Sequence, residues 1–326
     1  MTISLSPATG DLLAERVASA VREGLLSRPK RLPPWLFYDE AGSRLFERIT
    51  ELPEYYLTRT ERGILETHAA EMIDLAADGA LLRIAELGAG SADKTRLLLA
   101  AAARRQDEVI YEPVDVSATA LDAARERIER EIPGVAVAPQ VMDYTHALEL
   151  EPSGPDERRL VLYIGSSIGN FDPEDAAVVL RRVRSALKPG DSLLLGVDLV
   201  KEDSIVLAAY DDAVGVTAAF NRNLLARLNR ELGAAFDPDG FAHCAVWNDA
   251  KSRIEIYLES CVECTVRLSA LDLTVEFAQG ERIHTENSYK YRPGQIEAML
   301  ARAGFTPNAV WTDSRGWFGV YSGRVG

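Results

Sequence analysis

Three acidic residues stand near the ends of apolar segments, and a short glycine turn follows the first of them. Glu86 precedes the turn at residues 88–90, and Asp115 and Asp143 end the next two apolar segments. If the segments are parallel strands, their carboxyl ends share one edge of a sheet, where such sheets bind ligands. Glycine lets backbone approach a ligand, and carboxylates accept hydrogen bonds. The pattern therefore predicts a binding site for a ligand with hydroxyl and ammonium groups.

The turn containing Gly88 and Gly90 is compatible with three cofactors, which Asp93 helps to separate. Nucleotide triphosphate loops need G-x-x-x-x-G-K-[ST], and dinucleotide turns need a third glycine. Asp93 directly precedes Lys94 and occupies the place of that third glycine. A carboxylate there opposes phosphate, which disfavours both cofactors. S-adenosylmethionine (SAM) has no phosphate, and the three acids together favour it, although each acid alone could cap a helix.

Strand and helix patterns alternate from about residue 81 to residue 200. Apolar runs predict strands at residues 81–88, 108–116, 134–143, 158–165 and 188–200, and helical periodicity predicts helices at 92–105, 117–132 and 172–187. Ser117 and Asp172 are expected N-caps. Near the end, residues 293–304 predict a helix and residues 305–313 and 317–324 predict two strands. Such alternation builds a parallel sheet covered by helices, an α/β fold.

The remaining segments do not follow this alternation. Residues 201–291 predict two helices and then antiparallel β-strands with one solvated face. Residues 1–60 are rich in proline and aromatic residues, which either fill a core or cover a ligand. We therefore expect a methyltransferase domain at residues 62–200 and 292–326. Residues 1–61 and 201–291 are expected to form a substrate-binding domain.

The composition of the chain limits the classes of molecule that it is expected to bind. The 326-residue chain has a formal net charge of -14, which disfavours nucleic acid. The turn "IGSSIGNF" after the fourth strand lacks the Pro-Pro motif of nucleic-acid amine methyltransferases, so a small molecule or protein is the expected substrate. The four histidines and three cysteines show no metal-ligand spacing. No membrane or export segment is visible, so we expect a cytoplasmic monomer without a metal.

Several segments together resemble the histidine Nα-methyltransferases of ergothioneine biosynthesis, and the likeness covers nearly the whole chain. They are "LPPWLFYD", "LPEYYLTRTE", "ELGAGSADKTR", "IGSSIGNF", "GVDLVKE", "AYDDAVGVTAAFNRN" and "TENSYKYRP". The resemblance implies a class I methyltransferase (Rossmann-like) parallel sheet with an antiparallel C-terminal strand, plus a second α+β domain. It also implies trimethylation of the α-amine of L-histidine to hercynine, with three SAM consumed.

Cofactor positions can be transferred from the resemblance residue by residue. It places Gly88, Lys94, Asp115 and the pair Asp143–Tyr144 at the family's SAM positions. The glycine and acid pattern described above adds Glu86 and Gly90 to the cofactor-binding set.

Substrate positions follow in the same way. The resemblance places Tyr55, Asn170 and Tyr210 at the family's histidine positions, and it implies that Asn170 and Tyr210 hold the carboxylate and amine end. Because Asn170 and Tyr55 are neutral groups able to orient the amine, we expect them to be the catalytic pair. Glu286 and Ser288 would hydrogen-bond the imidazole. The pocket wall would include Tyr38 and Phe46, and Gly165, which opens the turn that carries Asn170, is also predicted to bind the substrate.

The residues leave alternatives open. Without the resemblance, Glu286 could face solvent and Tyr210 could belong to a core. One departure is Ile256, where the family has methionine, and we expect it to change pocket shape only slightly. The alternatives are methylation of another aromatic amino acid, a non-catalytic SAM-binding regulator and a nicotinamide-dependent oxidoreductase. The paired polar side chains disfavour tryptophan, because an indole has one donor and no acceptor.

Overall fold

The computed structural model describes residues 7–90 and 92–326, and the chain forms two compact units. The first unit contains Leu57–Val200 and Lys290–Gly326. In the described part, the second unit contains residues 7–56 and Lys201–Tyr289. The predicted substrate-binding domain starts with residues 1–6, which lie outside the described residues, as does Ser91 of the predicted cofactor turn. The functions predicted for the two domains remain predictions.

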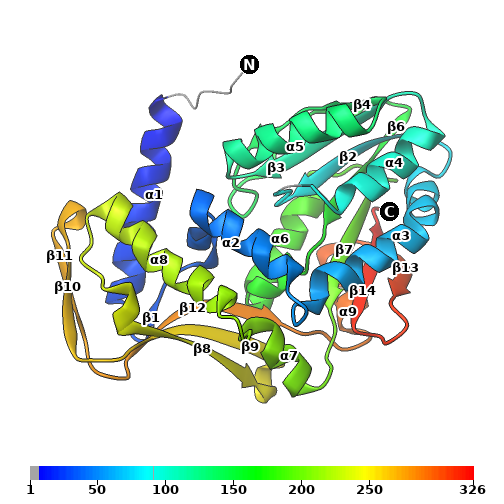
Figure 1. The fold of residues 1–326 in the computed structure, drawn as a ribbon. Helices are drawn as coiled ribbons and strands as arrows, with labels where there is room; N and C mark the ends of the chain where they lie inside the picture. The colour runs from blue at the N-terminus through cyan, green and yellow to red at the C-terminus, as the bar shows by residue number, and fades with distance from the viewer. Residues whose placement is uncertain (1–6, 91) are drawn as a thin grey trace. The chain divides into compact units, whose positions relative to one another are not determined.

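The first unit is built on a twisted mixed sheet with the order β13-β14-β7-β6-β2-β3-β4, and β5 also pairs with β3. The strands are β2 (Leu81–Leu87), β3 (Val109–Asp115), β4 (Val135–Val137), β5 (Gln140–Val141), β6 (Glu157–Tyr163), β7 (Ser192–Asp198), β13 (Thr306–Thr312) and β14 (Phe318–Arg324). Pairs from β4 to β7 are parallel, whereas β14 runs antiparallel to β7 and β13. Figure 1 shows β14 beside β7. The predicted fold class is confirmed.

Sequence patterns explain most of these elements. Every residue of β7 is buried, as expected for an apolar strand covered on both faces. The strand predicted over residues 134–143 forms as the two short strands β4 and β5, with Pro139 between them. Proline lacks the backbone N–H that a continuous ladder requires, which accounts for the interruption.

Helices cover this sheet. They are α3 (Tyr56–Ala77), α4 (Thr95–Arg105), α5 (Ala118–Glu131), α6 (Pro173–Ser185) and α9 (Gln295–Ala303). The predicted cap of α5 is confirmed, because the Ser117 side chain accepts a hydrogen bond from the Ala120 N–H. One core cluster joins apolar side chains of α6 and α9 to strands β2, β6, β7 and β14.

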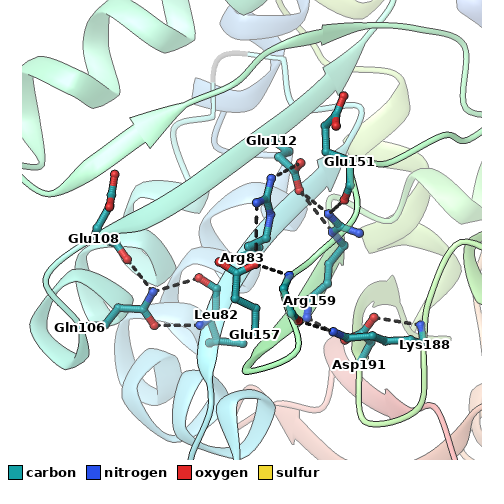
Figure 2. A network of polar contacts seen from close by, with 11 residues as sticks. Leu82, Arg83, Gln106, Glu108, Glu112, Glu151, Glu157, Arg159, Lys188 and Asp191 are labelled. Atoms are coloured by element: carbon teal, nitrogen blue, oxygen red, sulfur yellow. Dashed lines mark hydrogen bonds and ion pairs between the residues drawn. The ribbon is translucent and has the colours of Figure 1, made fainter.

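Charged residues near the amino ends of the strands pair with one another (Figure 2). Buried Glu112 accepts hydrogen bonds from Arg83 at 3.0 Å and from Arg159 at 3.1 and 3.2 Å. The Arg159 N–H donates to Asp191 at 2.8 Å. A cavity of about 420 Å³ lies at this edge, lined by Arg83 and Glu157 among others. Ligands of such sheets bind at the opposite, carboxyl edge, so we assign this network to stability.

The second unit combines helices with antiparallel strands. Its helices are α1 (Pro7–Leu26), α2 (Glu40–Glu51), α7 (Asp203–Tyr210) and α8 (Val216–Leu232), with a short 3-10 turn η1 (Pro34–Phe37). Its main sheet has the order β1-β12-β9-β8, from β1 (Lys30–Arg31), β8 (Phe241–Asn248), β9 (Arg253–Ser260) and β12 (Arg282–Tyr289). Strands β10 (Cys264–Leu268) and β11 (Leu273–Phe277) form a separate hairpin. The predicted antiparallel strands are confirmed, and β1 adds a parallel edge.

Two properties of the described part of the chain bear on its partners. In residues 7–90 and 92–326, no helix is long and apolar enough to cross a membrane. The same residues contain no group of three or more histidine, cysteine or acidic side chains arranged to hold a metal ion.

Candidate active site

The glycine turn directly follows β2, at the carboxyl edge of the first unit's sheet. Gly88 and Gly90 both have positive φ, at 67° and 51°, a conformation that side chains disfavour. A Cβ at Gly90 would have no neighbour within 4 Å, and one at Gly88 would lie 3.6 Å from the Tyr144 hydroxyl. The backbone here is therefore approachable, as a ligand bound against it requires.

Asp115, at the end of β3, holds this turn in place. One carboxylate oxygen accepts a hydrogen bond from the Gly90 N–H at 3.1 Å, and the other accepts one from the Ser117 N–H at 2.9 Å. Burial raises the pKa of Asp115. The Val116 N–H also contributes a backbone hydrogen bond. A carboxylate has about four acceptor positions, so these contacts leave room for a hydroxyl donor such as that of a ribose.

Asp143 and Tyr144 follow β5 along the same edge. The Asp143 carboxylate accepts hydrogen bonds from the Thr145 N–H at 2.9 Å and the Thr145 hydroxyl at 2.6 Å, which stabilise the turn. The Tyr144 ring packs edge-on against Tyr163 with 5.6 Å between centroids. Burial raises the pKa of Tyr144 to about 12, so its hydroxyl stays neutral. We call Gly88, Gly90, Asp115, Asp143 and Tyr144 the cofactor edge.

Glu86 lies beneath the glycine turn and supports it. Its carboxylate is buried and accepts hydrogen bonds from the Thr95 hydroxyl at 2.6 Å and from the Tyr111 hydroxyl. Burial raises the pKa of Glu86 to about 7. These contacts attach the first turn of α4 to β2 and β3. A direct contact between Glu86 and the cofactor remains a prediction.

Lys94 contacts an acid that sequence reasoning missed. Glu61 of α3 is completely buried, forms an ion pair with Lys94 and accepts hydrogen bonds from the Gly165 N–H at 2.9 and 3.0 Å. A Cβ at Gly196 would lie 2.1 Å from a Glu61 oxygen. Glycine inside an apolar strand often marks such a close approach, so Gly196 in β7 was the feature of the sequence that could have indicated a side chain packed against this strand. Glu61 thus connects Lys94 to the turn after β6.

Asp93 does not act as the sequence argument assumed. Its carboxylate forms an ion pair with Arg62 of α3, lies 3.4 Å from Arg96 and lies 3.7 Å from Arg127. Three guanidinium groups offset its charge, so repulsion of phosphate by Asp93 is a weak reason to reject phosphate cofactors. The choice of SAM has to rest on other observations.

The turn after β6 carries Asn170. Gly165 and Ser166 have φ angles of 82° and 62°, and a 3-10 turn, η2, covers Ser167–Asn170. The Ser166 hydroxyl accepts a hydrogen bond from the Asp198 N–H at 3.0 Å, which attaches the turn to β7. Asn170 is half-buried.

Aromatic residues from five segments of the second unit pack together. Tyr38 contacts Phe46 at 5.6 Å between ring centroids, Phe46 contacts Tyr55 at 6.3 Å, and Tyr55 contacts Tyr210 at 6.2 Å. Phe220 of α8 contacts Tyr38 and Phe46 at 5.8 and 6.0 Å and was missed, because one aromatic residue on a helix resembles ordinary core. The structure therefore brings the four predicted aromatic residues together.

Glu286 and Ser288 lie on one face of the second unit's sheet. Their partners across the strand pair are Ile256 and Ile254, which point to the same face. The Ser288 and Tyr210 hydroxyls are 2.7 Å apart and hydrogen-bonded. This face thus carries both a carboxylate and a hydroxyl, and the hydroxyl contacts one of the aromatic residues, Tyr210. We call Tyr38, Phe46, Tyr55, Tyr210, Glu286 and Ser288 the substrate set.

Comparisons with known proteins show the family of the chain. A family described as histidine-specific methyltransferase, SAM-dependent, matches residues 17–325. The chain is 47% identical over 323 residues to histidine N-alpha-methyltransferase of Mycolicibacterium smegmatis, covering 98% of each chain. It is 46% identical over 300 residues to histidine N-alpha-methyltransferase of Mycobacterium tuberculosis, covering 92% of each. It is also 32% identical over 312 residues to ergothioneine biosynthesis protein 1 of Neurospora crassa, covering 87% of this chain and 32% of that relative.

Proposed function

The chain belongs to the family of histidine-specific, SAM-dependent methyltransferases, and from this premise we propose that it methylates the α-amine of L-histidine in ergothioneine biosynthesis. We further propose that it transfers three methyl groups in succession and so forms hercynine. One observation carries the choice of substrate: the substrate set combines a carboxylate and a hydroxyl on one strand face with packed aromatic rings. An imidazole has two nitrogens that such a pair can bind.

The cofactor edge fits SAM chemically. Asp115 has room left for a ribose hydroxyl, and Gly90 leaves open space beside the backbone. When bound, SAM supplies a methyl group on a cationic sulfonium. We assign Gly88, Gly90, Lys94, Asp115, Asp143 and Tyr144 to SAM binding, with Glu86 beneath them.

The amine must reach the methyl carbon as a neutral nucleophile. The α-amine has a pKa near 8 in peptides and a higher pKa in free amino acids, and a water-poor site beside a positive charge lowers the pKa of an amine. A dedicated strong base is therefore unnecessary, and positioning supplies much of the rate. We assign that positioning to Asn170 and Tyr55, which are neutral groups.

Three successive transfers restrict how the substrate can be held. Each transfer leaves a methylated ammonium, which must release a proton to water before the amine can react again. One N–H donor is thus lost each time, so binding cannot depend on those donors. Recognition must therefore rest on the carboxylate, held by Asn170 and Tyr210, and on the imidazole, held by Glu286 and Ser288. The product keeps a permanent positive charge, which aromatic faces such as those of Tyr38 and Phe46 stabilise.

We also propose that the protein acts in the cytoplasm as a monomer without nucleic-acid partners or a metal. The net charge of -14 supports the exclusion of nucleic acid. Three cysteines without disulfides fit a reducing compartment.

A comparison of amino-acid substrates tests the proposed function. The protein is incubated with SAM and, separately, histidine, tryptophan, tyrosine or phenylalanine, and product masses and initial rates are measured. We expect up to three methyl groups on histidine and a kcat/KM for histidine at least about 100-fold above the others, because their side chains lack the two ring nitrogens that a carboxylate and a hydroxyl can bind together. Equal rates on tryptophan would favour another aromatic amino acid as the substrate.

A further inference from the structure

A β-bulge at Thr285 decides which way Glu286 points. In β12, His284 pairs with Tyr257 of β9, whereas Glu286 pairs with Ile256, and the register shifts between them. Neighbouring residues of β9 point to opposite faces, so His284 and Glu286 do too, although residues two apart in a regular strand share a face. The bulge therefore turns Glu286 and Ser288 away from the face of His284.

Thr285 is fixed by hydrogen bonds. Its side chain is fully buried, and its hydroxyl lies 3.0 Å from the side-chain oxygen of Asn221 and 3.1 Å from the carbonyl oxygen of Ile256. The contact to Asn221 connects the bulge to helix α8.

Asn221 uses both ends of its amide. Its oxygen accepts from Thr285, and its nitrogen donates to the His243 Nδ1 at 2.9 Å and to the Tyr257 carbonyl at 2.9 Å. The side chain is 1% exposed. A buried polar group with all its partners in place fixes one local geometry.

His243 carries the connection to Tyr210. Because the His243 Nδ1 accepts from Asn221, its Nε2 holds the proton and donates to the Tyr210 carbonyl at 2.9 Å. Burial lowers the pKa of His243, which favours this neutral form. The Tyr210 hydroxyl then meets Ser288 at 2.7 Å.

We propose that Asn221 is a positioning residue for substrate specificity, which fixes both the bulge that turns Glu286 and the carbonyl of Tyr210. This inference rests on the proposed function and deepens it. Through Thr285, Asn221 sets the direction of the carboxylate that recognises the imidazole. Through His243, it fixes the position of the carboxyl end of α7, where the Tyr210 hydroxyl contacts Ser288. Asn221 itself touches neither substrate.

Asn221→Asp tests the proposal with almost no change in shape. The carboxylate can still accept from Thr285 but cannot donate to His243 or to the Tyr257 carbonyl. Leaving buried groups unpaired should raise the KM for histidine roughly tenfold or more. The kcat at saturating histidine should change less, and the Kd for SAM, measured by calorimetry, should stay within about twofold.

Asn229→Asp is the matched control on the same helix. Asn229 donates to the Phe236 carbonyl at 2.8 Å and accepts from the Phe236 N–H at 2.9 Å, so this variant also loses an amide donor of α8, here a half-buried one. It should lower stability somewhat but keep the wild-type KM for histidine. Equal rises in KM in both variants would reduce the role of Asn221 to ordinary helix stability and overturn the proposal.

A second pair of variants tests the role of the Asn221–Thr285 contact if Asn221→Asp fails to fold. Thr285→Val removes the hydroxyl at nearly constant shape, whereas Thr285→Ser keeps it. The valine variant should raise the KM for histidine, and the serine variant should restore most of the affinity. An unchanged KM in Thr285→Val would overturn the inference. If instead the wild-type protein does not methylate histidine, the proposed function itself fails.

Discussion

The cofactor edge and the substrate set obtain their geometry in different ways. In the cofactor edge, Gly90 lies in the turn directly after β2 and Asp115 ends β3, and a hydrogen bond of 3.1 Å from the Gly90 N–H to the Asp115 carboxylate joins them. In the substrate set, Tyr38, Tyr210 and Ser288 come from distant segments and depend on a strand bulge. A short sequence motif can therefore determine the geometry of the cofactor edge, whereas the geometry of the substrate set requires the whole second unit to fold correctly.

The largest expected effect comes from a substitution that should weaken histidine use but not SAM binding, and so distinguishes the substrate set from the cofactor edge. Glu286→Ala removes the carboxylate of the substrate set, and charged hydrogen bonds contribute about 1.5–3 kcal/mol. The kcat/KM for histidine should fall roughly 100-fold, while the Kd for SAM stays within about twofold. Steady-state kinetics and calorimetry measure the two quantities. Equal losses in both would contradict the division between the cofactor edge and the substrate set.

The next prediction concerns stability: one buried acid in each unit should make the free energy of unfolding depend on pH, in opposite directions. The pKa of Glu86 is raised from 4.5 to about 7 by burial, so between these values the folded state binds more protons than the unfolded state. Stability contributed by Glu86 therefore falls as pH rises through this interval, by up to about 3 kcal/mol. Urea unfolding at pH 5 and pH 8 should show this fall in the wild type and not in Glu86→Gln.

Glu255 in the second unit should behave in the opposite sense. Burial alone would raise its pKa, but hydrogen bonds from Tyr257 and Arg253 outweigh burial and lower the pKa to about 2. Its contribution is thus present above pH 4.5 and is lost as pH falls through about 2. Glu255→Gln should destabilise the protein at pH 7 and have little effect at pH 2. Parallel pH curves for the Glu86 and Glu255 variants would contradict this contrast.

A smaller effect is expected for Asp115→Asn in the cofactor edge. The amide keeps one oxygen acceptor, but it loses either the Gly90 or the Ser117 contact and weakens the grip on ribose hydroxyls. The Kd for SAM should rise about tenfold, and the KM for histidine should change less than threefold. Calorimetry with SAM gives the first value, and an unchanged affinity would remove Asp115 from the proposed ribose site.

The smallest effect on histidine binding is expected from a change at Ile256. This residue of β9 pairs with Glu286 of β12 and points to the same face of the sheet. Ile256→Met approximately conserves apolar volume, and such swaps cost less than about 1.5 kcal/mol. The KM for histidine should change by no more than about threefold in steady-state assays. A larger change would show that this apolar wall, and not only the polar pair, sets the fit of the imidazole.

The sequence predicted where the residues of the cofactor edge lie better than the surroundings of the substrate set, for a physical reason. The place of Asp115 at the end of β3 was predicted from strand periodicity, a local property, and its role in binding SAM stays a prediction. Glu61 was missed because its contacts to Lys94 and Gly165 join segments more than 30 residues apart. The bulge at Thr285 was missed because period-two alternation says which residues share a face but not which face is covered.

The nature of the reaction product tests the central claim most directly. The protein is incubated with excess SAM and histidine until the reaction ends, and the product is analysed by mass spectrometry and proton NMR. The account predicts one product with three equivalent methyl groups on the α-nitrogen and an unmodified imidazole. A methyl group on an imidazole nitrogen, or a reaction that stops after one transfer, would contradict it.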